Sequence, residues 1–175
     1  MINLERKFLI MQIKTSYFYQ IRNFKQNMIP ISTCLSDPEW FKPPIGKEYY
    51  IDKRGIICGL RYEPLIVQSQ ASECIGKINA CPNYLAYTVH ANNSNYDLCQ
   101  FLSDYRQLLE KIDFDKMIKA FKFCLNKFNK DTIVLIVYEA PNNPCSERKC
   151  LQEYFCSHGI KCKELNYPIK ERKND

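Results

Sequence analysis

The chain has 175 residues, a length that suits one domain with a real core and is short for two. Hydrophobic residues make up 46% of the chain and charged residues 25%, as in ordinary globular proteins, and no apolar run reaches the ~20 residues of a membrane span. The net charge of +6 is compatible with an anionic ligand or with weak attraction to nucleic acid, although a lysine-rich solvated surface is the simpler explanation.

The chain has ten cysteines, whose chemical state depends on whether the protein is in an oxidising or a reducing compartment. The apolar start of the chain is interrupted by Gln12 and lacks a small-residue cleavage site, so we expect no signal peptide. We therefore expect a cytoplasmic protein whose cysteines are thiols, metal ligands or catalytic groups rather than disulfides. Residues 1–10 are a candidate N-terminal extension, because the first strand-like pattern begins near Met11.

The first part of the chain predicts short strands. Residues 10–18 alternate weakly between apolar and polar, and residues 28–34 are β-branched and contain a proline, which strands accept at a sheet edge. The Pro-rich and aromatic stretch 37–55 has no period and predicts a loop, whereas residues 60–67 predict another short strand. Residues 68–98 hold turn formers and cysteines without a sustained apolar stripe, which indicates an irregular insertion.

Two helices are predicted after the insertion. Apolar residues recur every three or four positions over residues 99–114 and 113–128, with Asp97 and either Asp113 or Asp115 as candidate N-caps. Residues 132–138, TIVLIVY, are continuously apolar and predict a strand buried on both faces. A helix over residues 146–159 and a strand over 161–167 close the chain. This order predicts a single α/β domain over 1–175, with a mostly parallel sheet flanked by helices.

Three segments resemble the uncharacterised bacterial family known as domain of unknown function 488, in the subgroup with a cysteine-containing insertion. They are TSYFYQIRNFKQNMIPISTCLSDPEWF, DLCQFLSDYRQLLEKIDFDKMIKAF and IVLIVYEAPNNPCSERKCLQEYF, and the likeness extends over about residues 11–168. The resemblance implies an α/β fold and supplies no established activity. The family's Cys-His-Arg tripeptide appears here as Cys145-Ser146-Glu147-Arg148, so a mechanism that uses that histidine as a base is in doubt.

The first candidate site combines Tyr138, Glu139, Cys145 and Arg148. Ligands of open α/β sheets bind beyond the carboxyl ends of the strands, and a helix that starts near Pro144 directs free N–H groups to the same space. Both the helix terminus and Arg148 favour a thiolate at Cys145, either as a nucleophile or in an anion-binding cradle. In the alternative, Cys145 packs at an ordinary helix start and Arg148 pairs with Glu139.

A second candidate group consists of Ser16, Tyr17, Tyr19, Ser32 and Thr33, which end the first two strands. If the strands are parallel, their polar groups lie at the same edge as Glu139 and fit a nucleotide or a sugar. Ser and Thr in such positions are also ordinary turn and cap residues.

Cys74, Cys81 and Cys99, with Cys58 and His90 nearby, form a candidate metal site for zinc or an iron–sulfur cluster. The spacing lacks a Cys-x-x-Cys knuckle, and buried thiols are the stronger interpretation. Aromatic and cationic residues are also interleaved near the loop 37–55, as in single-strand binding proteins, but we favour an aromatic lid over the core. These residues are Trp40, Phe41, Arg22, Lys25, Lys42 and Lys47.

Two functions from different classes are therefore open. In the first, a strand-end pocket binds an anionic ligand, a nucleotide or a nucleic-acid component, and Cys145, Glu139 and Tyr138 are candidate catalytic groups. No phosphate-binding glycine loop, His-Glu-x-x-His motif or catalytic triad accompanies them. In the second, a metal-stabilised module binds nucleic acid or protein without catalysis. We expect no membrane partner, and the sequence predicts neither the ligand nor the oligomeric state.

Overall fold

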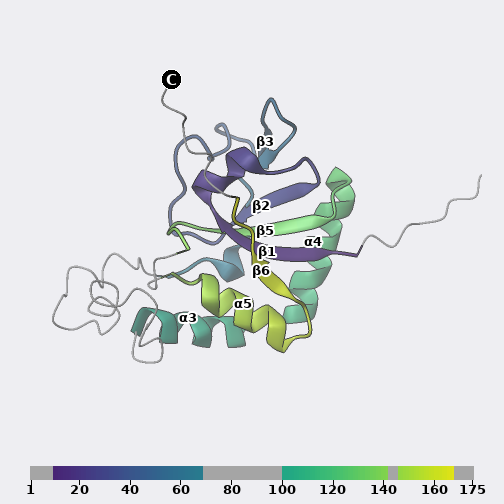
Figure 1. Ribbon diagram of the computed structural model, residues 1–175. Coiled ribbons are helices and arrows are strands. Elements are labelled where there is room, and N and C mark those ends of the chain that lie inside the picture. The colour runs from purple at the N-terminus through teal and green to yellow at the C-terminus, as the bar shows by residue number, and fades with distance from the viewer. Residues whose placement is uncertain (1–9, 69–99, 142–145, 168–175) are drawn as a thin grey trace, which may run out of the picture.

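The computed structural model describes residues 10–68, 100–141 and 146–167. Its elements in chain order are β1 (Gln12–Tyr17), the 3₁₀ helix η1 (Phe18–Asn23), β2 (Met28–Ser32), β3 (Tyr50–Ile51), β4 (Ile57–Cys58), the 3₁₀ helix η2 (Glu63–Leu65), α3 (Gln100–Glu110), α4 (Phe114–Phe128), β5 (Thr132–Val137), α5 (Arg148–Ser157) and β6 (Cys162–Glu164). Figure 1 shows the helices packed around a twisted main sheet.

The main sheet has the strand order β2-β5-β1-β6, and every neighbouring pair is parallel. β5 lies between β1 and β2, and each of its residues is buried. The prediction of a central strand over this apolar run is confirmed. Pro30 is in β2, at one end of the strand order, where its missing N–H costs least.

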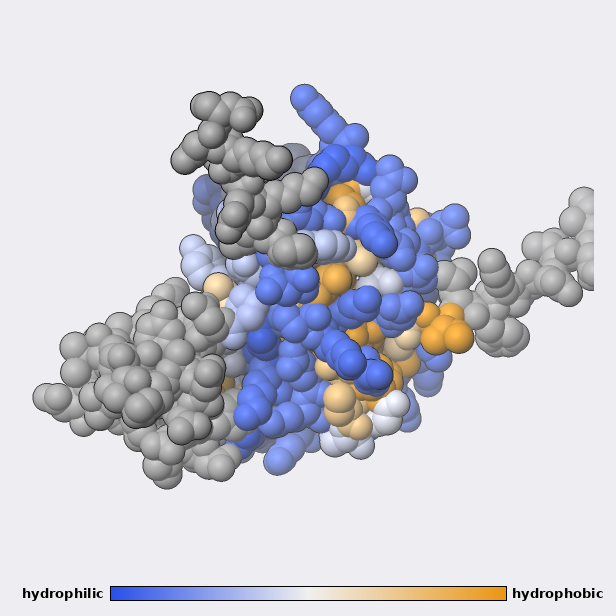
Figure 2. Space-filling view, in the orientation of Figure 1, coloured by the Kyte–Doolittle hydropathy of each residue, from blue (hydrophilic) through white to orange (hydrophobic). Residues whose placement is uncertain are grey.

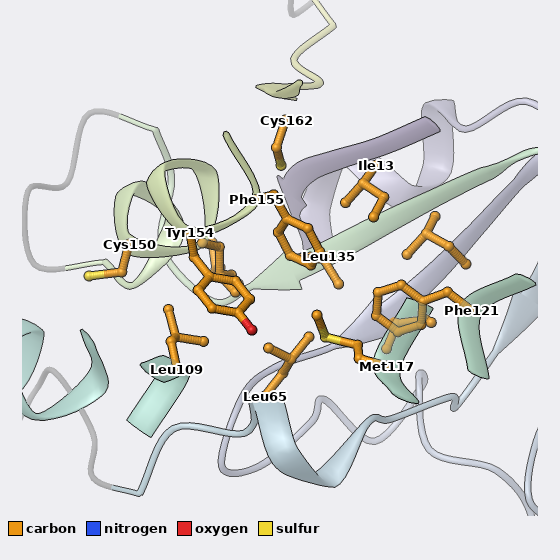
Figure 3. Packing of buried hydrophobic residues seen from close by; sticks show 14 of the residues in the cluster. Ile13, Leu65, Leu109, Met117, Phe121, Leu135, Cys150, Tyr154, Phe155 and Cys162 are labelled. Atoms are coloured by element: carbon orange, nitrogen blue, oxygen red, sulfur yellow. The ribbon is translucent and has the colours of Figure 1, made fainter. Parts of the chain in front are cut away.

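The sheet separates two hydrophobic clusters, because successive side chains of a strand point to opposite faces. Ile133 and Leu135 join the larger cluster with α3, α4 and α5, whereas Val134 and Ile136 join a smaller one with η1 and the segment after β2. Figure 3 shows Phe155 of α5 against Leu135 within the larger cluster. The α/β architecture with helices on the sheet is therefore as expected.

The helices follow their predicted periodicity closely. Asp113 caps α4, since its side chain accepts a hydrogen bond from the backbone N–H of Lys116 at 3.0 Å. Gly159, just beyond α5, has φ +78°, a conformation that ends helices and that glycine adopts without strain. Figure 2 shows a mostly hydrophilic face with hydrophobic residues in small areas. Among the described helices, none has both the length and the apolar character needed to cross a bilayer.

The strand predicted over residues 60–67 is wrong. Arg61 makes only an isolated bridge to Ser32, and η2 follows, with Pro64 in its first turn. Proline supplies no N–H for a ladder, so the chain turns here instead. The loop predicted over residues 37–55 contains β3, which pairs with β4 as a short antiparallel hairpin. The insertion predicted at 68–98 lies outside the described residues apart from Gln68, and so does the N-cap predicted at Asp97.

Candidate functional site

The carboxyl ends of the four parallel strands meet at one edge of the sheet, on the left in Figure 1. Tyr17 ends β1, Ser32 ends β2, Val137 ends β5 and Glu164 ends β6. Parallel α/β sheets bind their ligands beyond this edge. The groups around it are therefore the candidate site, and we call it the carboxyl edge.

The hydroxyl groups that we predicted to bind a ligand have partners within the protein. Ser16 donates to the carbonyl oxygen of Leu165 at 2.7 Å, and Ser32 donates to the Asp37 carboxylate at 2.5 Å. The Tyr17 hydroxyl accepts from Gln20 at 3.3 Å. Ser16 thereby links β1 to the chain after β6, and ligand binding by these residues stays a prediction.

Glu147, the residue before α5, has a fully buried carboxyl group beside Thr33. Thr33 Oγ1 lies 3.1 Å from the carbonyl oxygen of Ile136 and 3.1 Å from Glu147 Oε1. The single hydroxyl hydrogen of Thr33 is donated to Glu147 or to the Ile136 carbonyl, and a protonated Glu147 donates to Thr33 in turn. Burial and the nearby Glu139 carboxylate raise the pKa of Glu147 to about 8, against the opposing effects of the Thr33 hydrogen bond and the Arg148 charge. The shift favours the protonated form of Glu147 near neutral pH.

Glu139, two residues beyond β5, is the second carboxyl group of the pair. Burial raises its pKa, while the Arg148 charge and a hydrogen bond with Ser146 partly oppose the shift. Its Oε2 atom is buried and has no hydrogen-bond partner among the described residues. A buried acceptor without a partner is costly, so a donor supplied by a ligand would be favourable here.

The Glu147 proton should make the stability of the protein depend on pH. The unfolded chain loses this proton near the ordinary pKa of 4.5, whereas the folded protein keeps it until about 8. The free energy of unfolding should therefore fall by on the order of 3 kcal/mol as the pH rises from about 5 to about 8. In Glu147→Gln most of this loss should disappear, because an amide does not ionise yet still donates to Thr33, and only the part due to the raised pKa of Glu139 should remain.

Urea unfolding at a series of pH values measures this effect. Glu110→Gln, at an exposed position on α3, is the matched control and should keep the wild-type pH dependence. A Glu147→Gln protein that loses stability over the same pH range as the wild type would show that Glu147 is ionised in the native state.

Arg148 is 7% exposed, and protein groups surround its guanidinium group. Nε donates to Glu164 at 2.8 Å, and Nη2 donates to the carbonyl oxygen of Glu139 at 2.7 Å. Nη1 is shared between the Ala140 carbonyl and the Ser146 hydroxyl, at 3.1 and 3.3 Å. The same Glu164 oxygen also accepts from Thr15 at 2.7 Å. Arg148 therefore joins α5, β6 and the chain after β5, and its predicted contact with a ligand stays untested.

A second charge pair joins the segment after β2 to the segment after β4. Asp37, 2% exposed at its side chain, pairs with Arg61 at 2.7 Å. Cys34 lies near the same groups, and burial together with the charges of Glu147 and Glu139 raises its pKa strongly. Because the thiolate is the reactive form, Cys34 is a packing residue rather than a nucleophile.

Exposed aromatic rings border the carboxyl edge. The rings of Trp40 and Tyr138 each lie 6.0 Å from the buried ring of Phe18, measured between centroids, and both are edge-on to it. Trp40 is 52% exposed and Tyr138 is 63% exposed. The Arg22 guanidinium lies 3.4 Å from the centroid of the Tyr19 ring on η1. Trp40 and Tyr138 thus pack on the buried ring of Phe18 and remain partly exposed themselves, and the aromatic lid over the core stays a prediction.

Cys145 and the predicted metal ligands Cys74, Cys81 and Cys99 lie outside the described residues. Within residues 10–68, 100–141 and 146–167, no group of three or more His, Cys, Asp or Glu side chains could hold a metal ion. Zinc or iron–sulfur binding by the three cysteines stays a prediction.

Sequence reasoning missed Glu147, Asp37 and Glu164. Their predicted settings, a loop at 37–55, a helix start at 146 and a short strand at 161–167, give no local signal for burial, and the packing of distant segments covers them wholly or in part. A scan against models of known protein families, a search of curated proteins and a search of solved structures each return no match. The resemblance to domain of unknown function 488 stays a prediction.

Proposed function

We propose that the carboxyl edge binds a nucleotide or a nucleic-acid component, with its base on the rings of Trp40 and Tyr138. The observation that carries the proposal is the exposure of these two large rings, which both pack on Phe18 directly after β1, with Tyr138 immediately before Glu139. Exposed rings of this kind are where bases stack, and parallel sheets bind ligands at this edge.

The carboxyl pair supports a base as the ligand. Bases carry N–H groups on their edges, and Glu139 Oε2 is a buried acceptor without a partner among the described residues. Glu147, whose pKa of about 8 keeps it neutral, limits the negative charge at the edge. Arg22, exposed on η1 directly after β1, is the cation that we assign to the phosphate.

We also propose that the carboxyl edge catalyses a reaction of the bound ligand. A carboxyl group with a pKa near neutrality is suited to proton transfer, as in many active sites. Glu139, Tyr138 and Cys145 keep their proposed catalytic roles, with Glu147 as the group that holds the proton. The reaction itself is left open by this set of residues.

Nucleotide binding can be followed directly, because Trp40 is the only tryptophan of the chain. We expect mononucleotides to quench its fluorescence in a saturable manner. Tyr138→Ala should weaken binding by about tenfold, since base–aromatic stacking contributes ~1–3 kcal/mol per base. Calorimetry of the same titration measures this independently of the fluorophore.

Phe123→Ala is the matched control, because Phe123 is a similarly exposed ring on α4. It should leave the mononucleotide-dependent quenching of Trp40 unchanged, because Phe123 lies on α4 and Trp40 reports the carboxyl edge. Emission that no nucleotide alters at millimolar concentration, or equal effects of the two ring deletions, would argue against a base site at the carboxyl edge.

A further inference from the structure

The outward face of α4 combines lysines with an exposed aromatic ring. We call it the α4 face; its residues are Lys116, Lys119, Lys122, Phe123 and Lys127. All four lysines are exposed, and Phe123 is 71% exposed, although the helix already buries Met117, Phe121 and Leu125 on its other side. Amphipathic packing in the core therefore accounts for the inner face and not for Phe123.

The lysines of the α4 face make no close ion pairs among the described residues, although Asp113 and Asp115 lie in the first turn of the helix. None of them forms an ion pair with another described residue; Lys127 instead lies 5.1 Å from the centroid of the Tyr49 ring. Residues three or four apart lie on the same side of a helix, so Lys116, Lys119, Phe123 and Lys127 form one stripe. Lys119 and Lys127 then lie on either side of the ring, each about 6 Å along the helix axis from it, and Lys116 lies one turn beyond Lys119.

We propose that the α4 face binds single-stranded nucleic acid, with the lysines on phosphates and Phe123 stacked on an unpaired base. A nucleic-acid strand presents regularly spaced negative charges that match a row of lysines, and a free ring face stacks on any base. A single strand is favoured over a duplex, because bases within a duplex already stack on each other.

An anionic membrane is the less suitable partner. Helices that lie in a membrane surface bury a broad apolar face in the lipid, whereas the apolar face of α4 is already in the protein core. One exposed ring then remains for the lipid. The proposal is also independent of the carboxyl edge, because only residues 129–131 separate α4 from β5, so the last turn of α4 lies by the amino ends of the strands.

Fluorescence anisotropy with a labelled single-stranded oligothymidylate, over a series of salt concentrations, tests the proposal. Lys119→Gln/Lys122→Gln should weaken binding about tenfold near 0.1 M salt and reduce the salt slope by about 1.4, since each phosphate contact contributes ~0.7 for single strands. Phe123→Ala should weaken binding about fivefold or more and leave the slope unchanged, because stacking releases no counterions.

Lys161→Gln/Lys163→Gln is the matched control, because it removes the same charge from two exposed positions around the start of β6. It should bind like the wild type. Equal losses in both lysine pairs would overturn the proposal in favour of a net-charge effect. Phe123-dependent binding to phosphatidylserine vesicles without oligonucleotide binding, or a preference for duplex of the same length, would overturn it as well.

Discussion

Val134→Asp should prevent the protein from accumulating in a folded, soluble form. Val134 is fully buried in the central strand β5, in the cluster that contains Phe18 and Ile136. A carboxylate there would lose its hydration without gaining a partner, at a cost of several kcal/mol, which is comparable to the whole stability of a domain this size. Soluble yield and urea unfolding of the purified variant measure the effect.

Ile136→Val is the graded control in the same strand and cluster. Removal of one buried methylene should cost about 0.5–1.5 kcal/mol and leave a cooperative transition. A Val134→Asp protein that is soluble and unfolds cooperatively would be incompatible with a central β5. It would also contradict the arrangement of the carboxyl edge, which depends on that strand.

Arg148→Ala should lower the free energy of unfolding by about 3–5 kcal/mol, because it leaves a largely buried carboxylate without its cation. Arg148 and Glu164 are 8% and 20% exposed at their side chains, and Glu164 Oε1 already lacks a hydrogen-bond partner among the described residues. The variant also removes donors from the carbonyl groups of Glu139 and Ala140. The sequence alone suggested either a contact with an anionic ligand or a pair with Glu139, and not this pair with Glu164.

Two further variants isolate the charge pair. Arg106→Ala breaks an exposed pair with Glu153 at 3.5 Å and should cost less than about 1 kcal/mol. Adding Glu164→Gln to Arg148→Ala should restore part of the lost stability, because the unpaired charge is then gone, and the double-mutant cycle gives the coupling energy. An Arg148→Ala protein as stable as the wild type would leave the guanidinium available for the anion contact first expected of it.

Local sequence patterns were sufficient to predict most of the long helices and strands. The run TIVLIVY has too many consecutive apolar residues for a strand with one wet face, so it had to be a buried central strand. The spacing of Met117, Phe121 and Leu125 places three side chains on one side of a helix, and Asp113 precedes them as a cap. Such signals depend on neighbours within a few residues. The strand predicted at 60–67 failed because pairing partners, which are distant in sequence, decide short strands.

The candidate site was determined by contacts between distant segments. Thr33 and Glu147 are 114 residues apart, and Thr15 and Glu164 are 149 apart, yet each pair shares a buried hydrogen bond or a partly buried one. Sequence alone identified the strand ends and the residues Tyr138 and Glu139. Whether a carboxyl group is charged, or an arginine free, depends on how much water and which partners surround it. That environment exists only after the strands have come together, so the proton on Glu147 and the burial of Arg148 were decided by the tertiary structure.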